Sequence, residues 1–301
     1  MFQKMGLVSF LILISASLSS CEFATNTQAP NTQTPNTLVN ACDPINGIQN
    51  IISTDQPQIL VFGEVHGTKE SPEFIRDVVC HIIASGQSVT LAIEFSNTDY
   101  LDVQKYLDSE SASAESELLT QPYWIGGNQD GKRSLAMFDL FKDVKSYRAK
   151  TKKVDVIGFD IDHEEFEKIH RQPMRYIEDF REKTMANDLL TYANANPERR
   201  IVVLTGNLHS GRSKDESRPK MVDHIGREKY LSFEMRGPSG TVWTWIQGET
   251  KSGNNIPPNF LKNGSPLDER ALVLVGPQEI NGHDGFFYIV SKSVSRPTNT
   301  R

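Results

Sequence analysis

A short pattern that occurs twice limits the possible folds of this chain more than any other feature. The apolar run 59–62 is followed by Gly-Glu-Val-His at 63–66, and the apolar run 201–205 is followed by Gly-Asn-Leu-His at 206–209. Short runs rich in β-branched and other apolar residues are typical of buried strands. The sequence therefore predicts two buried strands, each of which ends in Gly-x-x-His.

Each copy continues in the same way. A helical stretch and a second strand follow the first copy, and this strand carries Glu94, 28 positions after His66. A shorter helical stretch and another strand follow the second copy, and that strand carries Glu234, 25 positions after His209. Because sites in open α/β sheets form at the carboxyl ends of the strands, two such units would gather two imidazoles and two carboxylates in one cleft. These side chains are typical of a metal site or of acid/base catalysis.

Strand-like and helix-like patterns alternate along most of the chain. The strand-like runs are 58–62, 88–95, 154–160, 200–205 and 230–235, and the helical patterns are 71–84, 97–107, 135–149, 163–195 and 218–228. This alternation predicts a three-layer α/β/α fold with a mainly parallel sheet and two related strand-helix-strand units. Three apolar runs near the C-terminus, 241–246, 271–275 and 286–290, predict extra antiparallel strands.

The N-terminal residues 1–20 have the features of an export signal. A short positive region precedes a brief apolar region, which is too short to be a permanent membrane span. The ending Leu-Ser-Ser-Cys resembles the lipobox of bacterial lipoproteins, in which Cys21 would become the lipidated first residue of the mature protein. Bacterial lipoproteins that stay in the inner membrane usually carry Asp directly after the lipidated cysteine. This chain has Glu22 there, so we expect an anchor in the outer membrane, on its periplasmic side.

Three further segments follow from composition. Residues 21–41 are mostly Thr, Asn, Gln, Pro and Ala, which predicts a flexible tether. Residues 42–295 are long enough for a single α/β domain with a full core, and 296–301 form a tail. The formal net charge of −6 and the lack of basic runs argue against nucleic acid as a partner and limit membrane contact to the anchor.

Cys42 and Cys80 are the two remaining cysteines. In an oxidising compartment they favour a disulfide that joins the start of the domain to the first helix. The alternative is that Cys80, on the apolar face of that helix, is a buried thiol. Both interpretations remain open at this point.

Residues 108–134 interrupt the alternation. A Ser/Glu-rich tract leads into Pro-Tyr-Trp-Ile-Gly-Gly at 122–127. Long insertions of this kind are usually functional or disordered. The segment is either a lid over the cleft or a surface loop whose Trp124 packs against the domain and stabilises it.

Several acidic residues accompany the histidines. Glu94 interrupts a run that otherwise reads as fully buried, and a buried carboxylate needs a partner. Glu64 and Glu70 flank His66, and Asp160 ends the third strand. The sequence lacks the Gly-x-Ser-x-Gly elbow, a P-loop and Gly-x-Gly-x-x-Gly, which argues against a serine hydrolase and against nucleotide chemistry.

At these residues the chain resembles the superfamily that joins erythromycin esterases, ChaN-type haem-binding lipoproteins and the Tiki/TraB proteins. The matching motifs are Gly-Glu-x-His-Gly-Thr-x-Glu at 63–70, Glu94 at the end of the second strand, Gly-Phe-Asp at 158–160 and Asn-x-His at 207–209. The resemblance implies a cleft lined by His66, Glu94 and His209, with a histidine as the general base for water or with a divalent metal held by the paired motifs.

The sequence thus predicts a lipid-anchored hydrolase of the cell envelope that acts on a small-molecule or peptide substrate. The expected catalytic residues are His66, Glu94, His209, Glu64 and Glu70; the expected ligands of a divalent metal (Zn, Mn or Co) are His66, His209, Glu94 and Glu234; Asp160 and Asn207 are expected to support them. The alternative is a haem or metal carrier without turnover, in which the aromatic residues of the insertion clamp a flat ligand.

Overall fold

The computed structural model describes residues 42–126, 130–244, 248–252, 269–275 and 281–298. All of them belong to the unit Thr34–Arg301. The predicted export signal, the lipidated Cys21 and the tether lie outside the described residues, so these stay predictions. No helix among the described residues is long and apolar enough to cross a membrane.

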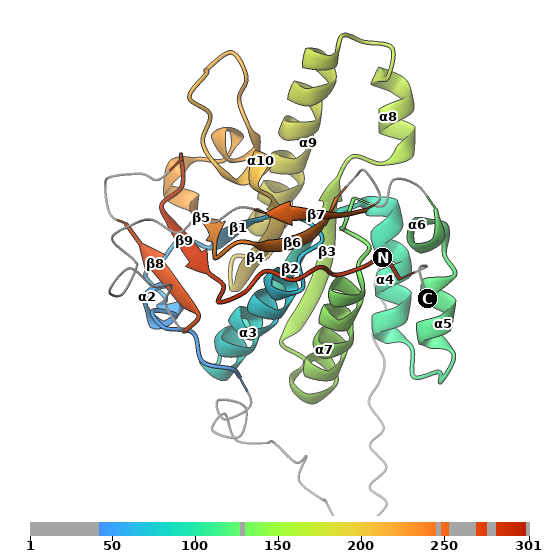
Figure 1. The fold of residues 1–301 in the computed structure, drawn as a ribbon, viewed down its shortest axis with the longest axis vertical. Coiled ribbons are helices and arrows are strands. Elements are labelled where there is room, and N and C mark those ends of the chain that lie inside the picture. Colours follow the sequence, from blue (N-terminus) through green and yellow to red (C-terminus); the bar gives the residue numbers. More distant parts are fainter. Residues whose placement is uncertain (1–41, 127–129, 245–247, 253–268, 276–280, 299–301) are drawn as a thin grey trace, which may run out of the picture. The chain divides into compact units, whose positions relative to one another are not determined.

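A seven-stranded sheet with the order β3-β2-β4-β1-β5-β9-β8 forms the centre of the fold (Figure 1). All neighbouring strands are parallel except β8, which runs antiparallel to β9. The strands are β1 (Ile59–Glu64), β2 (Ser88–Ser96), β3 (Val154–Asp160), β4 (Arg199–Gly206), β5 (Tyr230–Arg236), β8 (Ala271–Leu274) and β9 (Gly285–Tyr288). The predicted mainly parallel sheet is confirmed.

Helices cover both faces of this sheet. On β1, Leu60 and Phe62 pack into a core formed with α3 (Glu70–Ala84), α4 (Asn97–Asp108) and α7 (Leu135–Thr151). Ile59 and Val61 point to the opposite face, as the two-residue period of a strand requires, and pack against α9 (Met174–Ala195) and the 3-10 turn η1 (Met221–His224). Two apolar layers on one sheet make the predicted three-layer α/β/α fold.

The two strand-helix-strand units interleave in the sheet. Their four strands stand in the order β2-β4-β1-β5, so β1 and β4 lie side by side and the partners β2 and β5 lie outside them. If β1 is exchanged with β4 and β2 with β5, the same order is obtained, read from the opposite edge of the sheet. An approximate two-fold axis between β1 and β4 would relate the two units in this way. Gly63 pairs with Thr205, and Glu64 pairs with Gly206. The two Gly-x-x-His ends therefore leave the sheet at the same level.

Some predicted elements differ in the structure. The helical pattern 163–195 is two helices, α8 (His163–Ile169) and α9, because Pro173 cannot continue a helix. The pattern 218–228 contains only η1 and the short 3-10 turn η2 (Arg227–Lys229). Near the C-terminus, β6 (Gly240–Thr244) and β7 (Gly248–Ser252) form a separate antiparallel hairpin, and β9 adds to β5 in parallel.

The insertion 108–134 packs down on the domain. It contains α5 (Ala114–Leu119) and α6 (Pro122–Ile125). Trp124 is 1% exposed and contacts Phe95 and Phe141 edge to face. The alternative in which this tryptophan packs for stability therefore describes the structure.

Cys42 and Cys80 form a disulfide with a Cα–Cα distance of 5.7 Å. The bond joins the start of the described chain to α3. Both cysteines are buried, and they pack with Ala84 and Tyr147. The disulfide therefore lies on the face of the sheet that α3 and α7 cover.

Candidate active site

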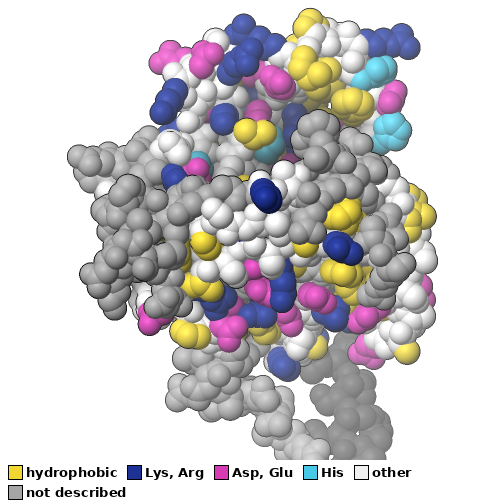
Figure 2. All heavy atoms as spheres, in the orientation of Figure 1, with side chains coloured by type: hydrophobic (Ala, Val, Ile, Leu, Met, Phe, Trp, Pro, Cys, Tyr) yellow, Lys and Arg dark blue, Asp and Glu magenta, His cyan; other side chains and the backbone are white. Residues whose placement is uncertain are grey.

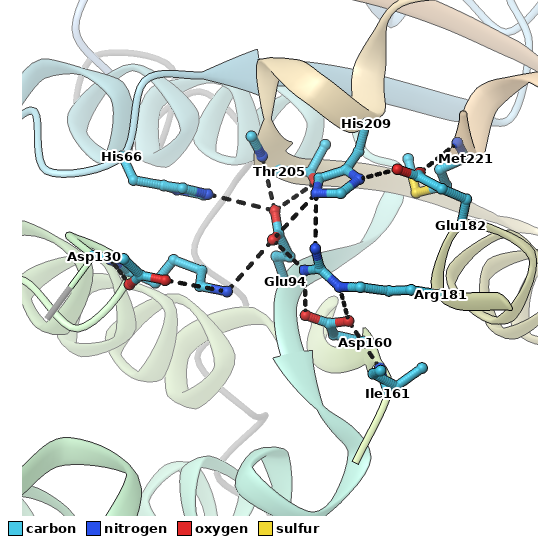
Figure 3. A network of polar contacts seen from close by, with 12 residues as sticks. His66, Glu94, Asp130, Asp160, Ile161, Arg181, Glu182, Thr205, His209 and Met221 are labelled. Atoms are coloured by element: carbon cyan, nitrogen blue, oxygen red, sulfur yellow. Dashed lines mark hydrogen bonds and ion pairs between the residues drawn. The ribbon is translucent and has the colours of Figure 1, made fainter. Parts of the chain in front are cut away.

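A buried carboxylate, that of Glu94, lies at the centre of a polar cluster at the carboxyl end of the sheet (Figure 3). Glu94 is at the end of β2, which runs next to β4. Thr205 Oγ1 donates a hydrogen bond to Glu94 Oε2 at 2.7 Å, and the Gly206 N–H donates to the same oxygen at 2.8 Å. The end of β4 therefore holds the carboxylate in one orientation. We call Glu94 and its neighbours the Glu94 cluster: Glu64, His66, Glu94, Lys132, Asp160, Arg181, Glu182, Thr205 and His209.

His66 lies between two carboxylates. Its Nδ1 is 2.9 Å from Glu64 Oε1, and its Nε2 is 3.5 Å from Glu94 Oε2. Burial lowers the pKa of His66, but the hydrogen bonds and charges of Glu64 and Glu94 outweigh burial and raise it to about 10. At neutral pH both ring nitrogens of His66 therefore carry protons.

His209 approaches the same carboxylate from the other side, with its Nε2 3.6 Å from Glu94 Oε1. Arg181 Nη1 lies 3.1 Å from this nitrogen, and His209 Nδ1 lies 2.8 Å from Glu182 Oε1. A guanidinium group can only donate hydrogen bonds. Nε2 of His209 is therefore the acceptor, and Nδ1 donates to Glu182. The two histidines therefore differ at Nε2, which donates towards Glu94 in His66 and accepts from Arg181 in His209.

Two cations complete the cluster. Arg181 Nη2 donates to Glu94 Oε1 at 2.7 Å, and the same side chain forms a two-pronged ion pair with Asp160 at 2.8 and 2.6 Å. Lys132 Nζ lies 3.4 Å from Glu94 Oε1. Burial raises the pKa of Glu94, but the charges of Lys132 and His66 and the hydrogen bond from His66 hold it well below its usual range. Glu94 is therefore ionised and surrounded by positive charge.

The insertion reaches this cluster through its last residues. Lys132 lies between Glu94 and Asp130. At Gly131, where φ is +97°, a Cβ atom would overlap the backbone of His66 and Gly67. Gly131 is thus packed against the loop that carries His66.

The arrangement does not fit the predicted metal. Arg181 donates to Glu94 Oε1 and to His209 Nε2, which are the atoms that would have to ligate the ion. Within the described ranges, no group of three or more His, Cys, Asp or Glu side chains is arranged to hold a metal ion. Glu234, the fourth expected ligand, pairs instead with Arg236 and accepts from Asn281 at 3.2 Å. Its side chain therefore belongs to a separate group of contacts.

The remaining predicted residues divide into two groups. Glu64 and Asp160 support the cluster, because each fixes one of its cations. Glu70 accepts hydrogen bonds from Ser291 and Ser293, and so ties the C-terminal segment to the start of α3. Asn207 begins α10 (Asn207–Ser210), and its Oδ1 would lie 2.7 Å from a Cβ on residue 63, where Ser210 Oγ is nearer still.

Sequence reasoning missed four members of the cluster: Lys132, Arg181, Glu182 and Thr205. Arg181 and Glu182 lie in the helical pattern 163–195, in which no site residue was expected. A local signal was present, because Met185, Ala186 and Leu189 form a buried stripe on α9. That stripe indicates that α9 packs on the sheet, but it does not identify which charged residue points at Glu94.

A cavity of about 370 Å³ adjoins the cluster. Arg181, Glu182 and His209 form part of its wall. The side chain of His209 is 10% exposed and that of His66 is 21% exposed. A volume of this size accommodates a small molecule or part of one.

The aromatic residues expected to clamp haem do not present their faces to a ligand. Tyr123 is 9% exposed, and it packs against Phe95 and Trp124 within the core. The guanidinium of Arg133 covers the Tyr123 ring at 4.3 Å. Haem binding stays a prediction, but Tyr123 and Trp124, the side chains that suggested it, are buried in the core.

No family model matches the chain, and no curated protein matches it. Among solved structures, an erythromycin esterase, a mutant of EreC in its open conformation, aligns over 79% of this chain and 92% of its own, with a TM-score of 0.59 and 12% identity. A succinoglycan biosynthesis protein aligns over 90% of this chain and 100% of its own, with a TM-score of 0.52 and 12% identity. A Bacillus cereus protein aligns over 84% of this chain and 92% of its own, with a TM-score of 0.51 and 12% identity.

The haem-binding ChaN of Campylobacter jejuni aligns over 62% of this chain and 84% of its own, at 12% identity, and its TM-score of 0.36 is too low to carry a conclusion. The similarity to EreC covers most of both chains, and it agrees with the resemblance that the strand-end motifs indicated. The chain therefore has the α/β fold of an erythromycin esterase.

Proposed function

We propose that this protein is an esterase-like hydrolase that activates water with its own side chains. The observation that carries the proposal is the pair of histidines on either side of Glu94. His66 is held as a proton donor between two carboxylates, and His209 has an acceptor nitrogen. Acid/base catalysis requires one group of each kind in a single site.

The roles follow from these contacts. His209 Nε2 would take a proton from the attacking water once this water replaces Arg181 as its hydrogen-bond donor, while Glu182 on its Nδ1 fixes the tautomer. His66 would donate a proton to the departing alcohol. Arg181 and Lys132 would stabilise the negative charge that develops on the carbonyl oxygen. His66 is the acid rather than the base, because a group with a pKa of about 10 holds its proton at neutral pH.

The location of the activity remains part of the proposal. The lipobox at Cys21 supports attachment to the cell envelope, on the periplasmic side of the outer membrane. The disulfide between Cys42 and Cys80 is compatible with an oxidising compartment. The fold that this chain shares with EreC supports the hydrolase class.

Hydrolysis of simple alkyl esters tests the proposal, because an alkoxide is a poor leaving group that needs the proton of an acid; the released carboxylic acid is followed by titration at constant pH. His66→Gln and His209→Gln should each lower kcat by about 100-fold or more. The wild-type rate should fall as the pH rises through about 10, because His66 then loses the proton that it must donate. This decline should be absent from the residual activity of the His66→Gln variant.

His163→Gln is the matched control, since the His163 side chain is 83% exposed on α8 and pairs only with Glu167 among the described residues. Full activity in both cluster variants would overturn the proposal. A wild-type rate that rises, rather than falls, as the pH passes through about 10 would also overturn the proposal.

A further inference from the structure

The cavity beside His209 has a second wall that the proposed chemistry does not use. This wall comes from the first turns of α9, from α10 and from the segment 217–220. Figure 2 shows Lys and Arg side chains gathered with acidic ones at the top of the molecule, where Figure 1 places α8 and α9. The residues of this wall are Arg175, Glu178, Asp179, Leu208, Ser217, Arg218, Pro219 and Lys220.

Several charges around the cavity are already neutralised. Arg181 is paired with Asp160 and Glu94. Glu182 accepts from His209 and from the Met221 N–H. These side chains hold the Glu94 cluster together, and their charges do not add to the surplus charge of the wall.

Among the described residues, three cations of the wall form no close ion pair, and Asp215, which interacts with the charges of Arg218 and Arg175, is not among the residues that line the cavity. In the part of the chain that the structure describes, Arg175, Arg218 and Lys220 form no ion pair within 4.0 Å. Arg175 Nη2 donates to the Ser217 carbonyl at 2.7 Å, which ties the segment to α9 without neutralising the charge. Asp179 is paired with Lys183, so the unpaired acid of the wall is Glu178. The wall therefore has surplus positive charge, although the chain as a whole carries −6.

An apolar side chain lies among these cations. Leu208 is 73% exposed and lines the same cavity, next to the catalytic His209. An ester bond near His209 would place a short apolar spacer on Leu208 and a terminal group near Arg218 and Lys220. Guanidinium groups bind carboxylates well, because the two planar groups match in geometry.

We infer that the substrate is a small anionic ester, in which a short apolar spacer separates the scissile bond from a carboxylate held by Arg218 and Lys220. The inference rests on the proposed hydrolase function. It adds a substrate class and two specificity residues. The cavity volume of about 370 Å³ limits this part of the substrate to a small group.

Two ethyl esters of the same shape test the inference. Monoethyl succinate carries the terminal carboxylate, and ethyl 4-methylpentanoate is its uncharged counterpart. We expect the wild type to prefer the succinate ester by about tenfold in kcat/KM, which corresponds to about 1.4 kcal/mol. In the double variant Arg218→Gln/Lys220→Gln this ratio should fall to about one, and added salt should lower it in the wild type. Lys214→Gln, an exposed lysine of the neighbouring loop outside the cavity, should keep the wild-type ratio.

Two failures can be distinguished. Equal rates on both esters, or a ratio that the double variant leaves unchanged, would overturn the substrate inference and leave the hydrolase proposal standing. If neither ester is hydrolysed, the hydrolase proposal fails. Calorimetric titration with succinate then tests whether Arg218 and Lys220 bind a carboxylate. Succinate binding that the double variant abolishes would support an anion site; no binding, or equal binding by both proteins, would overturn it.

Discussion

Replacing Glu64 with Gln should lower the pKa of His66 while preserving the shape of the site. Glu64 is 3% exposed and its Oε1 accepts from His66 Nδ1 at 2.9 Å. The amide oxygen of Gln can accept the same hydrogen bond, but it carries no charge. The change therefore removes one of the two negative charges that keep His66 protonated.

The magnitude follows from the position of His66. The pKa is 6.5 in the unperturbed side chain and about 10 in the folded protein. A carboxylate at this distance raises the pKa of a neighbouring cation by about 1 to 3, so the Glu64→Gln variant should titrate lower by that amount. Glu94 remains, and its charge keeps the value from falling as far as burial alone would take it.

The same difference predicts how stability depends on pH. Because protonation of His66 is favoured in the folded state, its contribution is fully present below pH 6.5 and is lost as the pH rises through about 10. The loss is about 1.4 kcal/mol per pH unit and reaches about 5 kcal/mol over the whole range. In Glu64→Gln the loss should end at a lower pH.

Ring carbon and proton chemical shifts of labelled histidine, followed from pH 5 to 11, measure the pKa directly. The spectrum of His66→Gln identifies the signal among the seven histidines of the chain. A wild-type His66 that titrates near 6.5, or a Glu64→Gln variant with an unchanged pKa, would refute the reasoning and the assignment of His66 as the acid.

Further predictions concern the scaffold and the anchor. Replacing Cys42 and Cys80 with Ser should lower the free energy of unfolding by about 4 kcal/mol on the chain-entropy model for a 38-residue separation, as denaturant unfolding without reductant can measure. Trp124→Ala should cost about 3–5 kcal/mol in the same assay, because its ring fills the core; a loss below 1 kcal/mol would contradict this packing. Gly63→Ala should cost about 1–3 kcal/mol and reduce esterase activity, since its Cβ would displace α10. Cys21→Ser should abolish labelling by radioactive palmitate; continued labelling would refute the lipobox.

The strands and most of the helices were predictable because their signals are local. The period of a buried strand and the apolar stripe of a helix are visible within a few residues. The 163–195 region shows the limit of this reasoning. Its charge pattern continues across Pro173, but the backbone does not, and the stretch forms α8 and α9.

The sequence alone determined which residues reach the cleft from the strand ends. Both Gly-x-x-His motifs follow parallel strands, so their histidines had to emerge at the same edge of one sheet. Glu94 had to find polar partners because it ends a buried run. His66, Glu94 and His209 could therefore be grouped before any distance was known.

The tertiary structure decided what these residues can do. Glu94 and Glu234 occupy corresponding positions in the two units, but α9 brings Arg181 to Glu94, while Arg236 pairs with Glu234 two residues away in its own strand. Arg181 is 87 positions from Glu94 in the chain, and no local pattern encodes an ion pair across that separation. It arises because the apolar stripe of α9 docks on the sheet and carries the neighbouring guanidinium with it. That docking makes a polar acid/base cluster from motifs that also suit a metal.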